Sequence, residues 1–281
     1  MSLPQPPSDL HEQVARALAE DIGAGDLTAA LIPEDQHASA TLLCREPAVI
    51  CGQPWVEACL EAVDPRLQIA WRVSEGAQVA ADTVLAHIEG PARGLLTAER
   101  TALNFLQTLS GTATVTARYV ERIRDTGCRV LDTRKTLPGL RTAQKYAVRC
   151  GGGHNHRMGL YDALLIKENH IAAAGSITAA VAEGRRRFPH APIEVETETL
   201  EEVNEALQAG ADRIMLDNFS LEAIRRAVER VDGQCELEVS GNVNLDNIRD
   251  YALTGVDYIS VGALTKHLHA IDLSLRVETV A

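Results

Sequence analysis

The sequence predicts an α/β protein in which a series of parallel strands follows a mixed N-terminal region. From about residue 128, short apolar strands alternate with helical stretches, and their polar ends recur at steps of 21 to 34 residues. Steps of this length suit strand-helix-strand units with right-handed crossovers. Up to about residue 112, strand-like runs instead follow one another closely with turn residues between them. That pattern is typical of a small antiparallel sheet.

Composition narrows the class of protein. A chain of 281 residues, 46% hydrophobic and 23% charged, can bury a real core in one or two domains. Its six cysteines show no CxxC or metal-ligand spacing, which favours free thiols in a reducing compartment. The start, "MSLPQPPSDLHEQV", lacks the features of a signal peptide, and no apolar run approaches the length of a membrane span. We therefore expect a cytoplasmic protein that does not enter a membrane.

The N-terminal region should hold one helix and several strands. Residues Ser8 to Glu20 form the helical stretch, and "ASATLLCREPAVI" and "LQIAWRV" are strand-like. The next run, "VSEGAQVAADTVLAHIEGP", looks like a structural hairpin. It also resembles part of a lipoyl or biotinyl carrier module, although no lysine stands where the prosthetic group would be attached. A non-enzymatic carrier or binding module is therefore an alternative.

Six strands are expected in the second region. They are "RVLDT", "ALLIK", "IEVET", "RIMLD", "ELEVS" and "YISVG", with helices such as "LEEVNEALQAG" and "LEAIRRAVERV" between them. Six units suggest a barrel or near-barrel, with a doubly wound sheet as the alternative. Both folds bind ligands at the carboxyl ends of their strands. The polar strand ends fall at Thr133, Lys167, Glu196, Asp217, Ser240 and Gly262.

Charge is distributed unevenly around these strand ends. Residues 132–170 hold seven Lys or Arg and three Asp or Glu, a balance of +4 in a chain whose formal charge is −12. A basic island in an acidic protein points to a small polyanion rather than to nucleic acid. Alternation places Glu194, Glu196 and Glu198 on one face of their strand, and Glu236, Glu238 and Ser240 on one face of theirs. We interpret these faces as a polar barrel mouth, because the strands of a parallel barrel are covered on both sides.

Several long motifs resemble the quinolinate phosphoribosyltransferase family. They are "DTRKTLPGLR" followed by "GGGHNHRMGLYDALLIKENH", with "EDIGAGDLT", "AERTALNFLQTLSG", "VSGN" and "SVGALT" in the family's order. The resemblance covers nearly the whole chain, and Glu168 stands where aspartate is commoner. It implies an α/β fold with an incomplete β/α barrel over residues 113–266 and a smaller N-terminal α/β sandwich domain over 1–112, completed by 267–281. It also implies a homodimer, possibly assembled further, with shared active sites.

The resemblance further implies a reaction of NAD biosynthesis. Quinolinate and phosphoribosyl pyrophosphate give nicotinate mononucleotide, pyrophosphate and carbon dioxide, with Mg²⁺. Guanidinium groups suit the two adjacent carboxylates of quinolinate, and the residues implied for quinolinate are Arg134, His156, Arg157, Lys167 and, from the partner subunit, Arg100. From helix periodicity alone, Arg100 would be an ordinary surface arginine on the polar stripe that it shares with Asn104 and Gln107. The same periodicity predicts an apolar stripe of Ala102, Leu103, Leu106 and Leu109.

The second substrate would occupy the other strand ends. Glu196 and Asp217 would hold Mg²⁺ or the ribose hydroxyls, and Lys135 would meet pyrophosphate, so that Lys135, Lys167, Glu196 and Asp217 form the catalytic set. Loops after late barrel strands commonly bind phosphate through backbone N–H groups. The remaining substrate-binding residues are then Thr133, Ser240, Gly241, Asn242, Val261, Gly262 and Ala263.

Other interpretations of the same residues stay open. Lys167 ends an apolar strand, as the nucleophile of a Schiff-base lyase does. His154 and His156 could bind zinc, although no third ligand stands at a telling spacing. Arg141, Lys145 and Arg149 repeat every four residues, which fits a solvated helix face, a dimer contact or a substrate site. The glycines at 151–153 are expected to end a helix.

Overall fold

A computed structural model describes residues 3–280 of this chain and divides it into two compact units. Unit 1 comprises Met1–Ala117, Thr136–Gly152 and His267–Ala281, and unit 2 comprises Arg118–Lys135 and Gly153–Lys266. The boundary expected between residues 112 and 113 lies inside one continuous helix, α3 (Ala92–Arg122). The segment Thr136–Gly152, expected in the barrel domain, groups with unit 1.

Unit 1 is built on a four-stranded antiparallel sheet. Its strand order is β12-β1-β5-β3, with β1 at His37–Cys44, β3 at Gln68–Trp71, β5 at Thr83–Pro91 and β12 at Leu273–Val280. Side chains of β1 alternate between buried and partly exposed, because successive residues of a strand point to opposite faces. Strand β12 comes from the C-terminal end of the chain and pairs with β1 from His37↔Val280 to Cys44↔Leu273. The C-terminal segment therefore completes this sheet.

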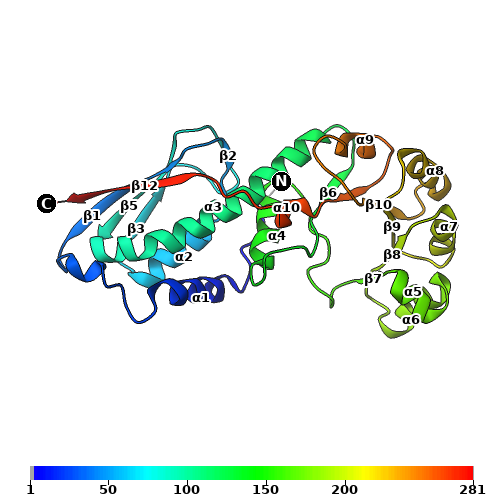
Figure 1. Cartoon of the computed structure of the whole chain (residues 1–281), viewed down its shortest axis with the longest axis horizontal. Coiled ribbons are helices and arrows are strands. Elements are labelled where there is room, and N and C mark those ends of the chain that lie inside the picture. The colour runs from blue at the N-terminus through cyan, green and yellow to red at the C-terminus, as the bar shows by residue number, and fades with distance from the viewer. Residues whose placement is uncertain (1–2, 281) are drawn as a thin grey trace. The chain divides into compact units, whose positions relative to one another are not determined.

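Helices cover the buried face of the sheet in unit 1 (Figure 1). They are α1 (Leu10–Ile22), α2 (Gln53–Val63) and α3, with the short helix η1 (Ala29–Leu31) and α4 (Arg141–Cys150) in the same unit. The predicted apolar stripe of α3 is confirmed, because Ala102, Leu103, Leu106 and Leu109 are all buried. Gly151 follows the last residue of α4, so the glycines end this helix as expected.

The prediction of a hairpin between residues 73 and 91 is wrong. The run does contain two strands, β4 (Gln78–Val79) and β5, but they pair with different partners. Strand β4 pairs with β2 (Ala48–Val49), whereas β5 lies between β1 and β3. A turn-rich sequence indicates where the chain reverses, but the choice of partner depends on which apolar faces can be buried together.

Unit 2 contains a six-stranded parallel sheet. Its strand order is β6-β11-β10-β9-β8-β7, and β6 and β7 are its outer strands. The six predicted strands are all confirmed, and the open order fits the incomplete barrel expected from the resemblance. The strands are β6 (Arg129–Leu131), β7 (Leu164–Ile166), β8 (Ile193–Thr197), β9 (Arg213–Asp217), β10 (Glu236–Ser240) and β11 (Tyr258–Ser260).

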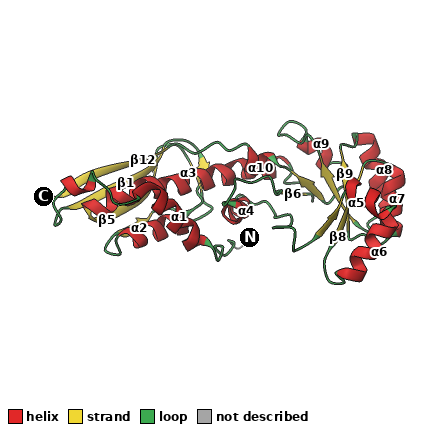
Figure 2. Ribbon diagram, turned by 60° about the horizontal axis from the view of Figure 1, so that its bottom comes forward, coloured by secondary structure: helices red, strands yellow, loops and turns green. Residues whose placement is uncertain are grey.

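Helices follow the strands of unit 2, and α6, α7 and α8 lie on the outer side of the sheet (Figure 2). Each of these three begins at a capping hydroxyl, from Ser176, Thr199 and Ser220 respectively, that accepts a backbone N–H of the first turn. Among residues 3–280, no helix is long and apolar enough to cross a bilayer. The helices of unit 2 are α5 (Glu168–Ala174), α6 (Ile177–Arg187), α7 (Leu200–Gln208), α8 (Leu221–Val231), α9 (Ile248–Ala252) and α10 (Ala263–Lys266).

Candidate active site

A pocket of about 290 Å³ opens at the carboxyl ends of the strands in unit 2. It brings together residues from the loops that follow β6 and β7 and from the strands β7 to β11, although these residues are spread over more than half of the unit's sequence. This convergence follows from parallel strands, whose ends meet at one edge of the sheet. The predicted site residues that line the pocket are Thr133, Arg134, Lys135, His156, Arg157, Lys167, Glu196 and Ser240.

Two arginines form the cationic side of this pocket. The Nε atom of Arg134 is buried and has no hydrogen-bond partner among residues 3–280. Arg157 donates through Nη1 to the carbonyl of Ala163 at 3.1 Å, and burial followed by the charge of Arg134 lowers its pKa. Two guanidinium groups that repel each other, one with a buried unused donor, are stabilised when an anion binds between them. The pair therefore fits an anionic ligand with more than one acceptor oxygen.

Lys167 and Glu196 form an ion pair inside the pocket. The ammonium of Lys167 contacts Glu196 Oε2, and their side chains are 41% and 13% exposed. Lys167 is also the N-cap residue of α5, and its backbone N–H donates to His170 Nδ1 at 3.0 Å. A Schiff-base lysine is usually activated by an apolar pocket or by a neighbouring cation. Lys167 instead faces a carboxylate, which favours a role for it as a cation.

His156 is the residue whose surroundings differ most from the expectation. Its Nδ1 accepts the backbone N–H of Arg157 at 2.8 Å, so this nitrogen carries no proton. Its Nε2 lies 2.8 Å from Glu194 Oε2 and 3.6 Å from Glu238 Oε2. Both ring nitrogens therefore face protein groups. A direct hydrogen bond from the His156 ring to quinolinate would require the ring to turn.

A buried acidic pair lies next to His156. Glu194 is 6% exposed and Glu238 is fully buried. Burial raises the pKa of Glu194 to about 7, and burial together with the charge of Glu194 raises the pKa of Glu238 to about 8. Arg213 partly compensates them, with its Nη1 3.3 Å from Glu238 Oε2 and its guanidinium 4.1 Å from the centre of the Tyr258 ring. At neutral pH, at least one of the two carboxyl groups is therefore protonated.

Sequence reasoning assigned no substrate-binding or catalytic role to either carboxyl group, although Glu238 lines the pocket. It did place Glu194 and Glu238 on the polar faces of their strands, and alternation was the signal that could have identified them. The zinc interpretation also changes, because His156, Glu194 and Glu238 offer ligand atoms within 4.8 Å of one another, whereas His154 is not part of this group. The group of possible ligands that the structure forms therefore differs from the histidine pair considered as an alternative.

Glu196 and Asp217 lie on neighbouring strands. Asp217 ends β9, pairs with Ser240 in the register of the sheet, and accepts a hydrogen bond from Asn218 Nδ2 at 2.8 Å. It is not among the residues that line the pocket. Magnesium typically takes one or two protein carboxylates and completes its shell with water and substrate phosphates. These two carboxylates fit that donor set.

The loop after β10 has a backbone that only glycine adopts easily. Gly241 has φ of +102°, and a Cβ atom there would lie 2.2 Å from Asn218 Oδ1. Asn242 also has positive φ, +50°, and its Nδ2 donates to Asn218 Oδ1 at 3.3 Å. Asparagine tolerates this region better than most residues. The loop is thus held tightly against the end of β9.

The turn after β11 offers fewer phosphate donors than expected. The N–H of Val261 donates to the carbonyl of Leu131 at 2.9 Å, so it is used within the sheet. Gly262 and Ala263 then remain as the backbone donors of this turn that a phosphate could use. A Cβ atom on Gly262 would lie 3.0 Å from Lys135 Cδ, which places Lys135 beside the turn.

Two other predicted cations lie in unit 1. Arg100 is on α3, its side chain is 59% exposed, and its Nη2 lies 3.8 Å from Glu99 Oε1. The basic face of α4 is not simply solvated, because Lys145 is only 1% exposed. The solvated-face interpretation is therefore wrong for Lys145.

Comparison with known proteins covers nearly the whole chain. Residues 26–110 match the model of the N-terminal domain of quinolinate phosphoribosyl transferase, and residues 112–276 match the model of its C-terminal domain. The chain is 43% identical to a nicotinate-nucleotide pyrophosphorylase [carboxylating] from Mycobacterium leprae, over 94% of this chain and 95% of that protein. A probable enzyme of the same name from Bacillus subtilis is 41% identical, over 92% and 90% of the two chains.

Solved structures show the same similarity. The nicotinate-nucleotide pyrophosphorylase from Francisella tularensis superposes with a TM-score of 0.95 at 48% identity, covering 99% of this chain and 100% of that chain. NadC from Streptococcus pyogenes gives a TM-score of 0.96 at 38% identity and covers 100% of both chains. The similarity therefore includes both units and the strand ends that form the pocket.

Proposed function

Because this chain belongs to the quinolinate phosphoribosyltransferase family and transfers a phosphoribosyl group to quinolinate with loss of a carboxyl group, we propose that the pocket at the strand ends of unit 2 is the active site. The reaction consumes phosphoribosyl pyrophosphate and yields nicotinate mononucleotide, pyrophosphate and carbon dioxide. The observation that supports the location most directly is the pair Arg134 and Arg157, because the buried Nε of Arg134 has no hydrogen-bond partner in the described part of the chain.

Quinolinate occupies the cationic side of the pocket. Its two adjacent carboxylates present four acceptor oxygens, which suits two guanidinium groups and the ammonium of Lys167. When quinolinate binds, Arg134 gains an acceptor for its buried donor. Lys167 can interact with quinolinate while keeping Glu196 as its counter-ion. His156 acts on this side by holding the backbone of Arg157 through Nδ1.

Phosphoribosyl pyrophosphate occupies the carboxylate side. Glu196 and Asp217 would hold Mg²⁺, or bind the ribose hydroxyls, and when bound the metal neutralises charge on the pyrophosphate. The 5′-phosphate is received by the loop of Ser240, Gly241 and Asn242 and by the N–H groups of Gly262 and Ala263. Lys135, which lies beside Gly262, meets the negative charge that develops on the leaving pyrophosphate.

The chemistry needs no covalent nucleophile from the protein. The pyridine nitrogen of quinolinate attacks the anomeric carbon as the bond to pyrophosphate breaks, through an oxocarbenium-like transition state. Catalysis then depends on holding the two substrates in line and on fixed charges around the reacting atoms. The carboxylate next to the ring nitrogen leaves as carbon dioxide, because the positive nitrogen stabilises the electron pair left on the ring carbon. That carbon then takes a proton from water, which gives nicotinate mononucleotide.

The assembly and the location of the protein are part of this proposal. We infer a homodimer, possibly part of a larger assembly, in which Arg100 of the partner subunit completes the quinolinate side. The exposure of Arg100 on α3 is consistent with this role. Six free thiols favour the reducing environment of the cytoplasm.

The direct test supplies quinolinate, phosphoribosyl pyrophosphate and Mg²⁺ and measures nicotinate mononucleotide together with carbon dioxide. The division of the site is tested with Glu196→Gln and Asp217→Asn, which should weaken the use of phosphoribosyl pyrophosphate far more than the binding of quinolinate measured by calorimetry. A selective loss of quinolinate affinity would reverse the assignment. Stable labelling of Lys167 by borohydride with a carbonyl substrate would instead support the Schiff-base lyase.

A further inference from the structure

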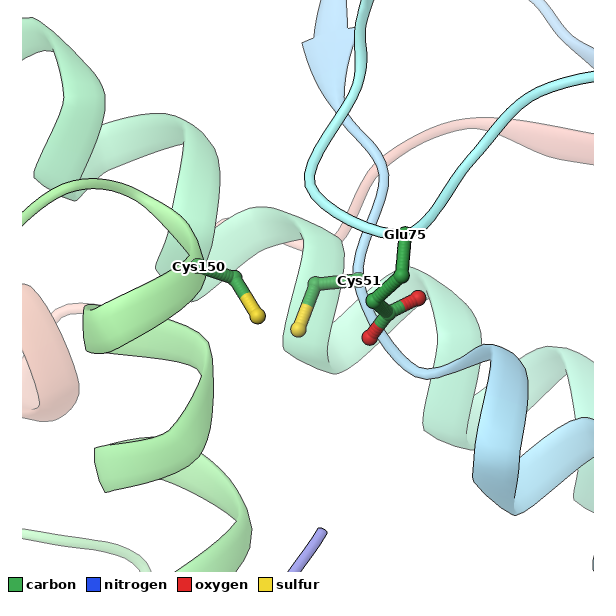
Figure 3. A group of neighbouring side chains, drawn as sticks. All are labelled: Cys51, Glu75 and Cys150. Carbon is green, nitrogen blue, oxygen red and sulfur yellow. The ribbon is translucent and has the colours of Figure 1, made fainter. Parts of the chain in front are cut away.

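Two thiols and a carboxyl group meet in unit 1, and none of the three residues is assigned to the reaction. Cys51 Sγ, Cys150 Sγ and a carboxylate oxygen of Glu75 lie within 4.8 Å of one another. The two cysteines are far apart in the sequence, one just before α2 and the other the last residue of α4. Figure 3 shows their sulfur atoms pointing toward each other, with the Glu75 side chain beside Cys51.

Hydrogen bonds hold Cys51 in place. Its backbone N–H donates to Ser110 Oγ at 3.0 Å, and the same hydroxyl donates to the Cys51 carbonyl at 3.2 Å. The Cys51 side chain is fully buried, whereas Cys150 is only partly buried. The thiol of Cys51 is therefore fixed and sheltered, and Cys150 is the more exposed of the two cysteines.

Glu75 lies where it can accept the proton of Cys51. Its side chain hydrogen-bonds to both Cys51 and Tyr146, and burial raises its pKa, which makes it a stronger base than an exposed glutamate. Burial, followed by the contacts with Cys150 and Glu75, raises the pKa of the Cys51 thiol, so this sulfur keeps its proton until a base removes it. A thiol within hydrogen-bond reach of a base can be activated as a nucleophile when the base takes its proton.

A structural metal is a poorer explanation of the cluster. Glu75 Oε1 accepts the N–H of Gly52 at 2.8 Å, and Oε2 accepts the N–H of Gln53 at 3.1 Å. Two backbone donors at the start of α2 therefore already hold this carboxylate, although each oxygen keeps a second lone pair for another hydrogen bond. A zinc site would also need a fourth ligand to complete its tetrahedron.

We propose that Cys51, Cys150 and Glu75 form a redox site in which a peroxide converts the two thiols into a disulfide. Cys150, the more exposed thiol, attacks the peroxide and becomes a sulfenic acid, and one water is released. The sulfur of Cys51 then attacks the sulfur of Cys150. The new S–S bond forms as the S–O bond breaks, and the proton of Cys51 passes through Glu75 to the departing hydroxide, which leaves as a second water. The peroxide is reduced by two electrons, and the two thiols supply them.

Peptide mapping of the full-length protein tests this assignment. The reduced protein is exposed to hydrogen peroxide at a small molar excess, its remaining thiols are alkylated after denaturation, and its disulfides are mapped by mass spectrometry. We expect one dominant cross-link, between Cys51 and Cys150, that dithiothreitol reverses. Cys51→Ser should leave Cys150 as a sulfenic acid that dimedone traps, and Cys150→Ser should abolish the cross-link. Cys59→Ser, which removes a buried thiol of α2, should leave the cross-link unchanged.

The role of Glu75 has its own measurement. Glu75→Gln should slow conversion of the sulfenic acid to the disulfide by about tenfold or more, since general bases typically contribute at least that much. Glu61→Gln, an exposed change on α2, should not slow it. The assignment is overturned if oxidation joins other cysteines, if no cross-link forms while Cys150 becomes over-oxidised, or if the isolated protein carries one equivalent of zinc that protects both thiols. An equal closing rate in Glu75→Gln would remove Glu75 from the mechanism.

Discussion

Replacing the buried acid Glu238 with glutamine should change how the stability of unit 2 depends on pH. The ordinary pKa of a glutamate is 4.5, and burial raises that of Glu238 to about 8. Below pH 4.5 the carboxyl group is protonated in both the folded and the unfolded chain, so its titration does not change the free energy of unfolding. Between pH 4.5 and 8 the unfolded chain releases the proton while the folded chain keeps it. The free energy of unfolding of the wild type therefore falls as the pH rises through this window.

The magnitude follows from the size of the pKa shift. Each pH unit within the window is worth about 1.4 kcal/mol, so Glu238 lowers stability by on the order of 4 kcal/mol at pH 8. Glutamine cannot ionise and keeps nearly the same shape. The free energy of unfolding of Glu238→Gln minus that of the wild type should therefore increase by about 2 to 3 kcal/mol between pH 5.5 and 7.5.

The assay has to report on unit 2, because both tryptophans, Trp55 and Trp71, lie in unit 1. Hydrogen exchange of peptides from β8 to β10, measured by mass spectrometry across a urea series at pH 5.5, 6.5 and 7.5, meets this need. Glu236→Gln is the matched control, since Glu236 is on the same strand and also pairs with Arg213 but is 49% exposed. If the curves of Glu238→Gln and the wild type stay parallel across this pH range, Glu238 is not a buried acid with a raised pKa.

Three further predictions concern the reaction. If Arg100 acts in the partner's site, mixing inactive Arg100→Ala with inactive Lys167→Ala should restore about a quarter of the sites at random subunit exchange, and no recovery after proven exchange would contradict sharing. Nicotinate should be used on the order of 10⁴-fold less well than quinolinate by kcat/KM, because donors that pair with the missing carboxylate stay buried and unpaired; a ratio within about tenfold would refute the dicarboxylate pocket. Gly241→Ala should lower kcat/KM for phosphoribosyl pyrophosphate by at least about tenfold through backbone strain at the phosphate loop. The control Gly233→Ala changes a glycine that also has positive φ but lies in open space, so the folded fraction of this variant should keep its activity. Equal activity of the two variants would show that Gly241 is not part of the phosphate site.

Much of the fold could be predicted from local patterns. The six strands of unit 2 were found because short apolar runs with polar ends repeat at the spacing of strand-helix-strand units, and such units form parallel sheets almost regardless of their detailed sequence. The same repetition predicted that Arg134, Lys167 and Glu196 would meet at one edge of the sheet. The apolar stripe of α3 followed from helix periodicity in the same way. These features depend only on spacing along the chain.

Pairing between distant segments could not be predicted in this way. Alternation along "VSEGAQVAADTVLAHIEGP" indicated strands, but not that β4 would pair with β2 and β5 with β1 and β3. Helical spacing placed Lys145 on a basic face, yet the packing of α4 leaves it 1% exposed. In both cases periodicity defines which face of an element a residue occupies, while burial depends on what packs against that face.

The sequence by itself determined the fold class, the order of the strands along the chain and the cationic character of the site, because each depends on residue type and spacing. Only the tertiary structure decided that both nitrogens of His156 face protein groups, that Glu194 and Glu238 share a buried site, and that Cys51 lies beside Cys150. The physical reason is that hydrogen-bond partners and raised pKa values arise from desolvation and from charges brought together by folding. The residues adjacent in the sequence supply neither the desolvation nor these charges.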